Sequence, residues 1–301
     1  MAHRDRRRAQ ASHRAPTRPA TGWPQGPVPI GSGTAELITS PDDPTAVTLM
    51  VNGVPSSHLD LADPLRLEFE YMQQMAAVLD AIPGDDRGDR PFRAVHLGAA
   101  GCAMARWVDA RRPGARQIAV DLDPVLVELV RGWFDLPRSP ALRLRAGDAR
   151  AQLETLADDS ADAVLRDVFA GDRTPEHVTT VEFTTAVHRV LRPGGVYLAN
   201  CADRPPLALA RDEVATVAAV FERVALVAEP SVLRGRRYGN VLLIGTDDPD
   251  LLDDPSLART LRSLPVPARL LTGAELADFA RRGTPLHDAA DVQELPDAAQ
   301  D

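Results

Sequence analysis

The sequence contains no lysine, so all 34 of its basic residues are arginine. Without lysine the chain cannot form a Schiff base with a carbonyl substrate, and it cannot hold a nucleotide through the lysine of a P-loop. Cysteine is also scarce: Cys102 and Cys201 are far apart, and neither has companions at the spacing of zinc ligands. We therefore expect two free thiols, a reducing compartment and no bound metal.

Long apolar runs are absent as well. No stretch approaches the roughly 18 uninterrupted apolar residues of a membrane-spanning helix. The first 20 residues are polar and arginine-rich, unlike the apolar core of a signal peptide. We therefore expect a cytoplasmic protein that does not contact membranes.

The net charge is unevenly distributed. Residues 1–30 hold six arginines and one acid, a net charge of +5, whereas the whole chain has a net charge of −9. The rest of the chain is therefore near −14. An acidic body repels nucleic-acid phosphates, so we expect no nucleic-acid partner, and a cationic small molecule suits it better.

The chain divides into four parts by composition. Residues 1–33 are rich in Arg, Pro and Gly without any periodic pattern, which predicts a disordered tail. Residues 34–64 hold short extended runs around Asn52-Gly53, a pair typical of a β-hairpin turn. Residues 65–246 have the pattern of a single α/β domain, and residues 247–301 form an Asp-, Pro- and Ala-rich C-terminal extension.

Strand and helix patterns alternate through the α/β domain. The predicted strands are residues 93–97, 117–121, 142–146, 163–167 and 196–200. Between them the apolar spacing predicts helices near 102–111, 124–134, 149–157 and 180–191. This alternation is typical of a parallel sheet covered on both faces. Two more runs, 224–228 and 240–246, follow a helix near 210–221 and are joined by a loop too short for a crossover, so they should pair antiparallel.

Five parallel strands followed by an antiparallel pair are the plan of a class I S-adenosylmethionine-methyltransferase-like domain. We therefore expect an α/β fold with a seven-stranded Rossmann-like sheet, preceded by a small N-terminal β-hairpin region. Domains of this kind bind their ligands at the carboxyl edge of the sheet.

Small residues follow the first of these strands, as Gly98-Ala99-Ala100-Gly101. At this edge of a sheet, small residues let backbone N–H groups approach a bound nucleoside. A tight strand-to-helix turn without a ligand explains the same residues, because alanine replaces two of the glycines that would make the loop distinctive.

Acidic residues end the next two strands. Asp121 ends the second strand about 20 residues after the glycine loop, the place of an acid that accepts from ribose hydroxyls. Asp123 precedes Pro124 and is the better N-cap for the helix that follows. Gly147 and Asp148 follow the third strand, where Asp148 fits equally well as a helix cap or as an acceptor for an adenine amino group.

Asp167 closes the fourth strand, and no helix begins for about a dozen residues after it. A helix-capping role therefore does not explain this carboxylate. At the end of a central strand it faces the crevice in which ligands bind, where it can take a proton from an attacking amine.

These motifs together resemble the spermidine synthase (polyamine aminopropyltransferase) family, in a divergent bacterial branch, over about residues 34–246. The resemblance rests on the Asn52-Gly53 turn, residues 98–101, Asp121-Leu122-Asp123, Gly147-Asp148, Asp167 and residues 192–196. It implies transfer of an aminopropyl group from decarboxylated S-adenosylmethionine to an amine, releasing methylthioadenosine. It also implies Asp167 as the base, Asp121 at the ribose and Asp148 near the adenine.

The chain departs from the family pattern mainly in the half that would bind the amine. No glutamine follows the Asn52-Gly53 turn, Ala170 replaces a second acid three positions beyond Asp167, and the family's Tyr and His pattern does not align cleanly with residues 68–72. We therefore expect weak activity with putrescine and a better acceptor among other amines.

Three functions remain open on the sequence: an aminopropyltransferase with an altered small-molecule acceptor, an S-adenosylmethionine-dependent methyltransferase, and a non-catalytic nucleoside-binding homologue. The co-substrate would be decarboxylated S-adenosylmethionine or S-adenosylmethionine itself, without a metal. The sequence also leaves a homodimer open.

Overall fold

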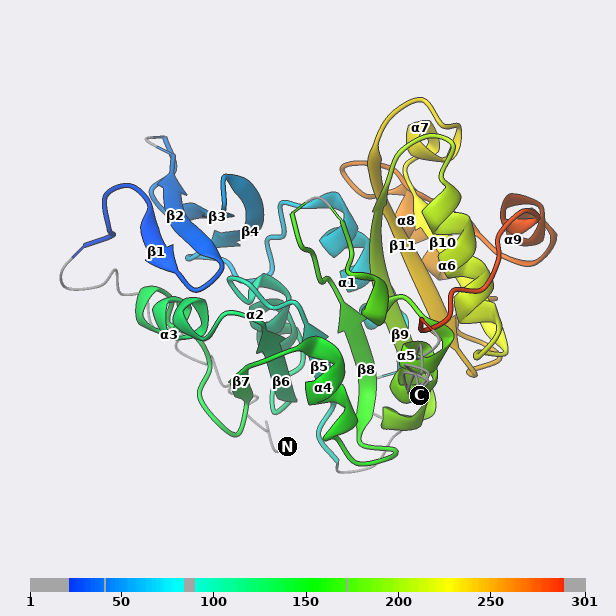
Figure 1. Ribbon diagram of the computed structural model, residues 1–301, viewed down its shortest axis with the longest axis horizontal. Helices are drawn as coiled ribbons and strands as arrows, with labels where there is room; N and C mark the ends of the chain where they lie inside the picture. Colours follow the sequence, from blue (N-terminus) through cyan, green and yellow to red (C-terminus); the bar gives the residue numbers. More distant parts are fainter. Residues whose placement is uncertain (1–21, 41, 84–89, 172, 290–301) are drawn as a thin grey trace, which may run out of the picture.

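The computed structural model describes residues 22–40, 42–83, 90–171 and 173–289. They form a four-stranded sheet of order β1-β2-β3-β4 and an eight-stranded sheet of order β12-β10-β11-β9-β8-β5-β6-β7. In Figure 1 the small sheet lies above α3 at one side of the large sheet.

The small sheet is antiparallel throughout and contains β1 (Val28–Ile30), β2 (Gly33–Thr39), β3 (Ala46–Val51) and β4 (Val54–Asp60). The turn between β3 and β4 is the predicted Asn52-Gly53 pair, with φ of 52° and 77°. Positive φ at both positions is the geometry in which this pair favours a tight hairpin. The predicted hairpin turn is therefore confirmed.

The large sheet contains the following strands: β5 (Arg93–Leu97), β6 (Arg116–Asp121), β7 (Leu142–Ala146), β8 (Ala161–Arg166), β9 (Leu191–Asp203), β10 (Arg223–Ala228), β11 (Gly239–Thr246) and β12 (Arg269–Leu271). The pairs β6–β7, β5–β6, β5–β8 and β8–β9 are parallel. The pairs β9–β11 and β10–β11 are antiparallel. The predicted class I fold is confirmed, with two differences: β12 pairs with β10 and makes the large sheet eight-stranded, and the N-terminal region is a four-stranded sheet instead of a hairpin.

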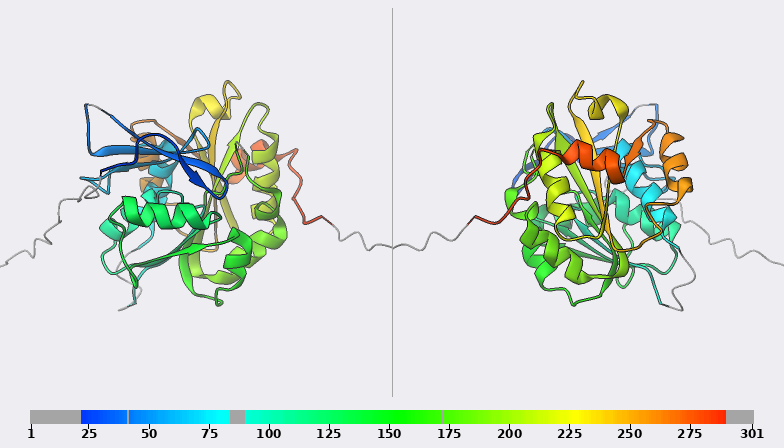
Figure 2. Two further views of the ribbon diagram at one scale, coloured as in Figure 1. Left: turned by 60° about the vertical axis from the view of Figure 1, so that its left-hand side comes forward. Right: turned by 90° about the vertical axis from the view of Figure 1, so that its right-hand side faces the viewer.

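Helices cover both faces of this sheet, as Figure 2 shows. They are α1 (Glu70–Ala81), α2 (Ala103–Arg111), α3 (Pro124–Trp133), α4 (Ala149–Glu154), the 3-10 turn η1 (Glu176–Val178), α5 (Val181–Val190), α6 (Ala208–Ala218), α7 (Pro230–Leu233), α8 (Pro255–Arg262) and α9 (Gly273–Ala280). One buried cluster joins one sheet face to α1, α2, α3, α8 and the small sheet, and a second joins the other face to α4, α5, α6 and α9. Consecutive residues of β8 alternate between the two, Leu165 in the first and Val164 in the second. This two-sided burial explains why the central strands are almost continuously apolar.

The predicted disordered tail is wrong over its last residues, whereas residues 1–21 lie outside the described part. Trp23 is 8% exposed and packs on Phe134, with 5.7 Å between ring centroids. Beyond it, β1 pairs with the start of β2, and Ser32 donates to Asp123. A three-residue strand is too short to show a period in the sequence, and its order comes from these long-range contacts.

Candidate active site

A cleft of about 690 Å³ opens at the carboxyl ends of β5, β6, β7, β8 and β9. The small sheet closes one side of it through Val51, Asn52 and Val54, and α1 contributes Glu70 and Tyr71. The volume lies within the range of about 300–1,000 Å³ that ligand pockets usually have. Asp121, Gly147, Asp148 and Asp167, which the sequence singled out, all line it.

The glycine loop is held against the end of β8. Gly98 has φ +83°, and a Cβ atom there would lie 2.1 Å from the carbonyl oxygen of Asp167. The Asp167 N–H donates to the Leu97 carbonyl at 2.8 Å. Gly98 is therefore required both by its backbone conformation and by the close passage of the chain beside Asp167.

The N–H groups of the loop are occupied by the protein itself. Gly98 and Ala99 both donate to the Val120 carbonyl, at 3.0 and 2.9 Å. Gly101 donates to the Ser57 hydroxyl at 3.0 Å, and a Cβ atom there would meet the Ser57 side chain at 2.8 Å. The loop thus reaches the cleft through Gly98 and Ala100, whereas Gly101 packs against β4. The N–H groups of residues 98–101 thus organise the loop, and the approach of this loop to a nucleoside stays a prediction.

Asp121 connects the loop to the end of β6. Its carboxylate accepts from the Ala100 N–H at 2.8 Å and from the Asp123 N–H at 3.2 Å. Burial raises the pKa of Asp121 above its usual value, while these backbone hydrogen bonds oppose that rise. A carboxylate has about four acceptor positions, so capacity for ribose hydroxyls remains.

Asp123 has the capping role that its position predicts. It accepts from the N–H groups of Val125 and Leu126 at the start of α3, and from the side chain of Ser32 at 2.8 Å. Both acids line the cleft, but Asp123 is engaged by α3 and Ser32, whereas Asp121 keeps acceptor capacity for a ligand.

Asp148 is also a helix cap. It accepts from the Ala151 N–H at 2.9 Å, and its second oxygen lies 2.7 Å from His177 Nε2. Burial by itself raises the pKa of Asp148, but the hydrogen bonds from Ala151 and His177 outweigh it and leave the pKa below its usual value. The capping role is confirmed, and contact with adenine stays a prediction.

Asp167 is held by two side chains from distant parts of the sequence. The Tyr71 hydroxyl donates to one oxygen at 2.8 Å, and the Asn200 amide donates to the other at 2.9 Å. Burial raises the pKa of Asp167, and these two hydrogen bonds partly counteract it. Burial also keeps Tyr71 protonated by raising its pKa well above the usual value. The result is an oriented carboxyl group with an elevated proton affinity, as proton transfer requires.

Asn200 is in turn positioned by a buried ion pair. Arg166 is fully buried, and its guanidinium lies 2.6 Å from Glu213 and 3.1 Å from the Asn200 carbonyl. The same guanidinium donates to the Val178 carbonyl at 3.0 Å. Breaking such a pair leaves a buried charge without compensation, so this junction of β8, β9 and α6 is firmly fixed.

The sequence assigned no role to Tyr71 or Asn200, although Tyr71 lies within residues 68–72, where the resemblance to the family's Tyr and His pattern was incomplete. Tyr71 occupies a predicted helix, where an aromatic residue is ordinarily a core residue. The sequence does contain a signal for Asn200, because a polar residue there ends the apolar run 196–199. In the structure Asn200 is 1% exposed. Glu70, Tyr238 and Asn240 also line the cleft, and Asn240 donates to Glu70 at 3.2 Å.

The cleft is strongly acidic. Glu70, Asp121, Asp123, Asp148 and Asp167 line it, and no arginine is among its described lining residues. The chain has no lysine, so the imidazole of His177 is the single basic side chain among the described lining residues. The field in the cleft therefore favours positively charged ligands.

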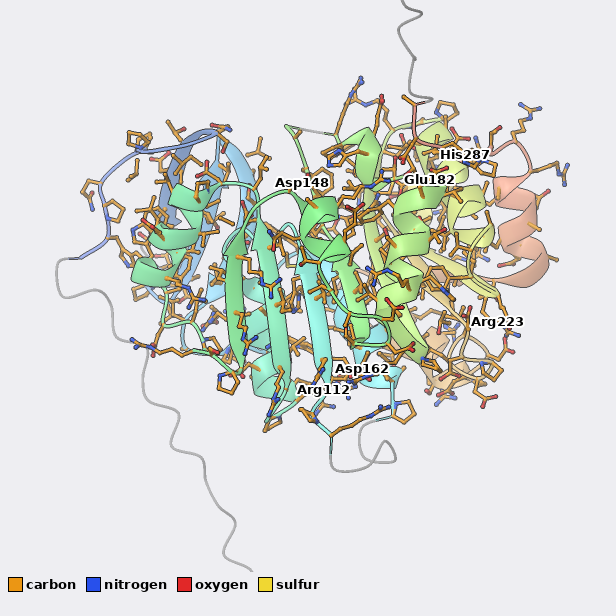
Figure 3. The ribbon with its side chains drawn as sticks, turned by 60° about the horizontal axis from the view of Figure 1, so that its bottom comes forward. Arg112, Asp148, Asp162, Glu182, Arg223 and His287 are labelled. Atoms are coloured by element: carbon orange, nitrogen blue, oxygen red, sulfur yellow. The ribbon has the colours of Figure 1, made fainter. Side chains whose placement is uncertain are left out.

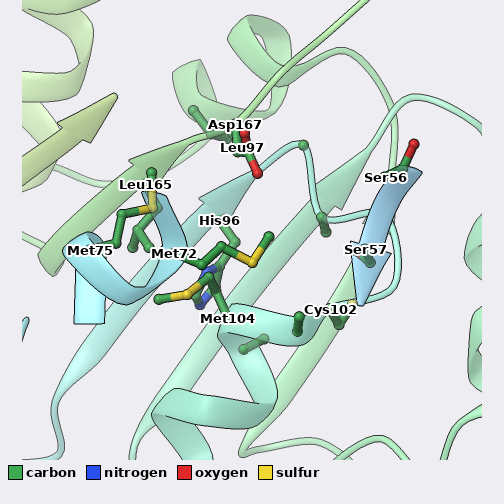
Figure 4. A pocket seen from close by; sticks show the side chains of 14 residues that line it. Ser56, Ser57, Met72, Met75, His96, Leu97, Cys102, Met104, Leu165 and Asp167 are labelled. Carbon is green, nitrogen blue, oxygen red and sulfur yellow. The ribbon is translucent and has the colours of Figure 1, made fainter. Parts of the chain in front are cut away.

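A second, much smaller cavity of about 20 Å³ lies beneath Asp167 (Figure 4). Met72, Met75 and Met104 surround His96 there. Burial lowers the pKa of His96 to about 4, and its Nε2 lies 2.8 Å from Gln117. A space of this size holds about one water molecule, so the ligand-sized site is the larger cleft.

The described residues contain no group of three or more His, Cys, Asp or Glu arranged to hold a metal ion. None of the helices in that part of the chain is long and apolar enough to cross a membrane.

Comparison with known proteins agrees with this geometry. The profile of a methyltransferase domain matches residues 95–199. The polyamine aminopropyltransferase of Chromobacterium violaceum is 31% identical over 144 residues, which are 48% of this chain and 53% of that protein. That of Vibrio vulnificus is 28% identical over 137 residues, 45% of this chain and 44% of that protein. The chain thus matches about half the length of these curated relatives.

Solved structures extend the match over most of the chain. Human methyltransferase-like protein 13, in complex with SAH, shares the fold at 21% identity, with a TM-score of 0.52 over 75% of this chain and 97% of that one. A probable spermidine synthase from Corynebacterium glutamicum is 38% identical, with a TM-score of 0.82, and the match covers 90% of this chain and 99% of that one. This chain belongs to the spermidine synthase family.

Proposed function

We propose that this protein transfers the aminopropyl group of decarboxylated S-adenosylmethionine to a small amine and releases methylthioadenosine. The amine nitrogen attacks the propyl carbon attached to the sulfonium. The carbon–sulfur bond breaks, its electron pair neutralises the sulfur, and the amine proton passes to Asp167. Because the sulfonium is already a good leaving group, the protein has to orient the partners and accept the proton.

The acidity of the cleft carries this proposal. Decarboxylated S-adenosylmethionine presents a sulfonium and an ammonium but no carboxylate, and it meets five acids and no arginine among the described lining residues. S-adenosylmethionine adds a carboxylate that would need a partner there. An uncompensated anion beside like charges is unfavourable, so the decarboxylated form should bind better.

The individual roles follow from position. Asp121 would accept from the ribose hydroxyls, and Gly147 and Asp148 would lie at the adenine. Asp167, with its raised pKa and its hydrogen bonds from Tyr71 and Asn200, would be the base. We assign nucleoside binding to the domain of residues 65–246 and the closing side of the cleft to the hairpin region 34–64.

A methyltransferase using S-adenosylmethionine is the second candidate, favoured by the methyltransferase profile over residues 95–199. A methyltransferase would have to bind the methionine carboxylate near residues 98–101. The N–H groups of these residues already donate to other groups of the protein. A non-catalytic homologue that binds only the nucleoside is the third.

A thermal-shift panel separates these candidates. Decarboxylated S-adenosylmethionine, S-adenosylmethionine and methylthioadenosine are each added to the full chain. A ligand at 100 times its Kd stabilises the folded protein by about 2.7 kcal/mol. The proposal expects shifts with the decarboxylated form and with methylthioadenosine, and a weaker shift with S-adenosylmethionine. A larger shift with S-adenosylmethionine would favour the methyltransferase, and no shift with any of the three would refute nucleoside binding.

A further inference from the structure

The described chain ends in a C-terminal strap, residues 283–288, that crosses α5 and α6. Thr284 and Leu286 donate their N–H groups to Asp212 and to the Thr216 hydroxyl, each at 2.9 Å. The Leu286 carbonyl accepts from Val181 at 2.8 Å, at the start of α5. Figure 3 shows His287 beside Glu182. The Glu182 carboxylate accepts a hydrogen bond from Nδ1 of the His287 ring at 2.9 Å.

The strap is joined to α4 by a bidentate ion pair. The two carboxylate oxygens of Asp288 lie 2.7 and 2.6 Å from the terminal nitrogens of Arg150. Parallel hydrogen bonds of this kind fix the plane of the guanidinium as well as its distance. The hydrogen bonds from Arg150 are also the main reason that the pKa of Asp288 is lowered to about 2.

Arg150 extends this connection to the cleft. Its guanidinium donates to the His177 carbonyl at 3.3 Å, and the His177 ring lies 2.7 Å from Asp148. His177 and Asp148 both line the cleft, at the end where we place the nucleoside. A continuous series of hydrogen bonds thus runs from Asp288 through Arg150 and His177 to Asp148.

These contacts matter because burial does not fix the side chains of His177 and Asp148. The side chains of His177 and Asp148 are 46% and 40% exposed. His177 also belongs to η1, a three-residue 3-10 turn, which is too short to be stable without outside contacts. Within η1 the neighbouring Val178 is buried and accepts from Arg166, whereas the exposed side chains of His177 and Asp148 depend on the hydrogen bonds that reach them.

We infer that Asp288 and Arg150 are positioning residues that hold His177 and Asp148 for the nucleoside, so that the C-terminal strap sets the affinity for the donor. This inference rests on the proposed nucleoside site. It predicts an effect on donor binding and a much smaller one on the chemical step, because Asp167 has separate supports in Tyr71 and Asn200.

The test compares Asp288→Asn with the wild type in the full chain. Calorimetry with methylthioadenosine should show a Kd about three- to tenfold higher, the range typical of residues that act on a site without contacting the ligand. Turnover should show a similar rise in KM for the donor, with kcat within twofold. Arg150→Lys keeps the charge but not the bidentate geometry, so it should reproduce the effect, and Asp288→Glu should restore part of the affinity.

Asp253→Asn is the matched control. Asp253 pairs with Arg223 on the surface, and Figure 3 places Arg223 away from Asp148. The control variant should bind like the wild type. If Asp288→Asn and Arg150→Lys bind as the wild type does, or if Asp253→Asn weakens binding equally, the inference is overturned while the proposed function stands. A wild-type protein that binds no methylthioadenosine would instead contradict the proposed function, and this inference with it.

Discussion

The two ends of the cleft are built in different ways. At the proposed nucleoside end, residues 98–101 and Asp148 lie in the turns that follow β5 and β7, and Asp121 is the last residue of β6 between them. At the other end, Asp167 meets Tyr71 from α1 and Asn200 from β9, which are 96 and 33 positions away in the sequence. The first arrangement repeats a local motif, whereas the second exists only after the chain has folded.

This difference separates binding from chemistry in a testable way. The nucleoside end uses carboxylates tied to backbone N–H groups, as in Asp121 and Asp148. The end at Asp167 uses side-chain hydrogen bonds that tune one carboxyl group. Substitutions at the first end should change affinity, and those at the second should change the rate and its pH dependence.

Asp167→Asn should have the largest effect. It keeps the shape of the side chain and removes the proton acceptor, so kcat should fall by about 10²–10⁴-fold. Methylthioadenosine affinity should change little, because Asp121 and Asp148 remain. Steady-state kinetics combined with calorimetry measures both quantities, and a variant that keeps full turnover would show that another group takes the proton.

Asp121→Ala should weaken methylthioadenosine binding by roughly 1.5–3 kcal/mol, because the ribose hydroxyls lose a charged acceptor. Asp123→Ala is the neighbouring control. It removes the cap of α3 and should lower the free energy of unfolding by about 0.5–2 kcal/mol with little change in affinity. Equal losses of methylthioadenosine affinity in the two variants would mean that Asp121 has no special role in binding the ribose.

Tyr71→Phe should act on the pH profile. Burial raises the pKa of Asp167, and the hydrogen bonds from Asn200 and Tyr71 lower it. Removing the Tyr71 hydroxyl therefore raises this pKa further, and the base is ionised only at higher pH. The acidic limb of kcat/KM should move to higher pH, with the loss of turnover confined to the pH range of that limb. If the acidic limb of kcat/KM does not move, the ionisation of Asp167 does not control the rate.

Ala170→Asp should have the smallest effect. Ala170 is exposed in the lining of the cleft, where the family pattern has an acid. An exposed ion pair is worth about 0.2–1 kcal/mol, so kcat/KM for putrescine should rise by a factor of roughly 1.4 to 5. If the wild type already uses putrescine efficiently, the missing acid does not limit the choice of acceptor.

The sequence predicted the fold, and it singled out cleft-lining residues at the proposed nucleoside end, because both rest on local patterns. Strand–helix alternation identified the parallel sheet, and Asp123 was recognisable as a cap from the Pro124 beside it. The partners of Asp167 could not be predicted in this way, since nothing near Tyr71 or Asn200 in the sequence points to residue 167. The strand β1 and the burial of Trp23 were missed for the same reason, because both depend on contacts with distant residues.

If the acidic cleft selects a cationic, decarboxylated donor for aminopropyl transfer, the products must differ between the two donors. Mass spectrometry of the products measures this difference, with the full chain incubated with either donor and a panel of amines. We predict an aminopropylated amine and an equal amount of methylthioadenosine from decarboxylated S-adenosylmethionine, and no transfer from S-adenosylmethionine. A methylated product formed from S-adenosylmethionine, without aminopropyl transfer from the other donor, would contradict this selection.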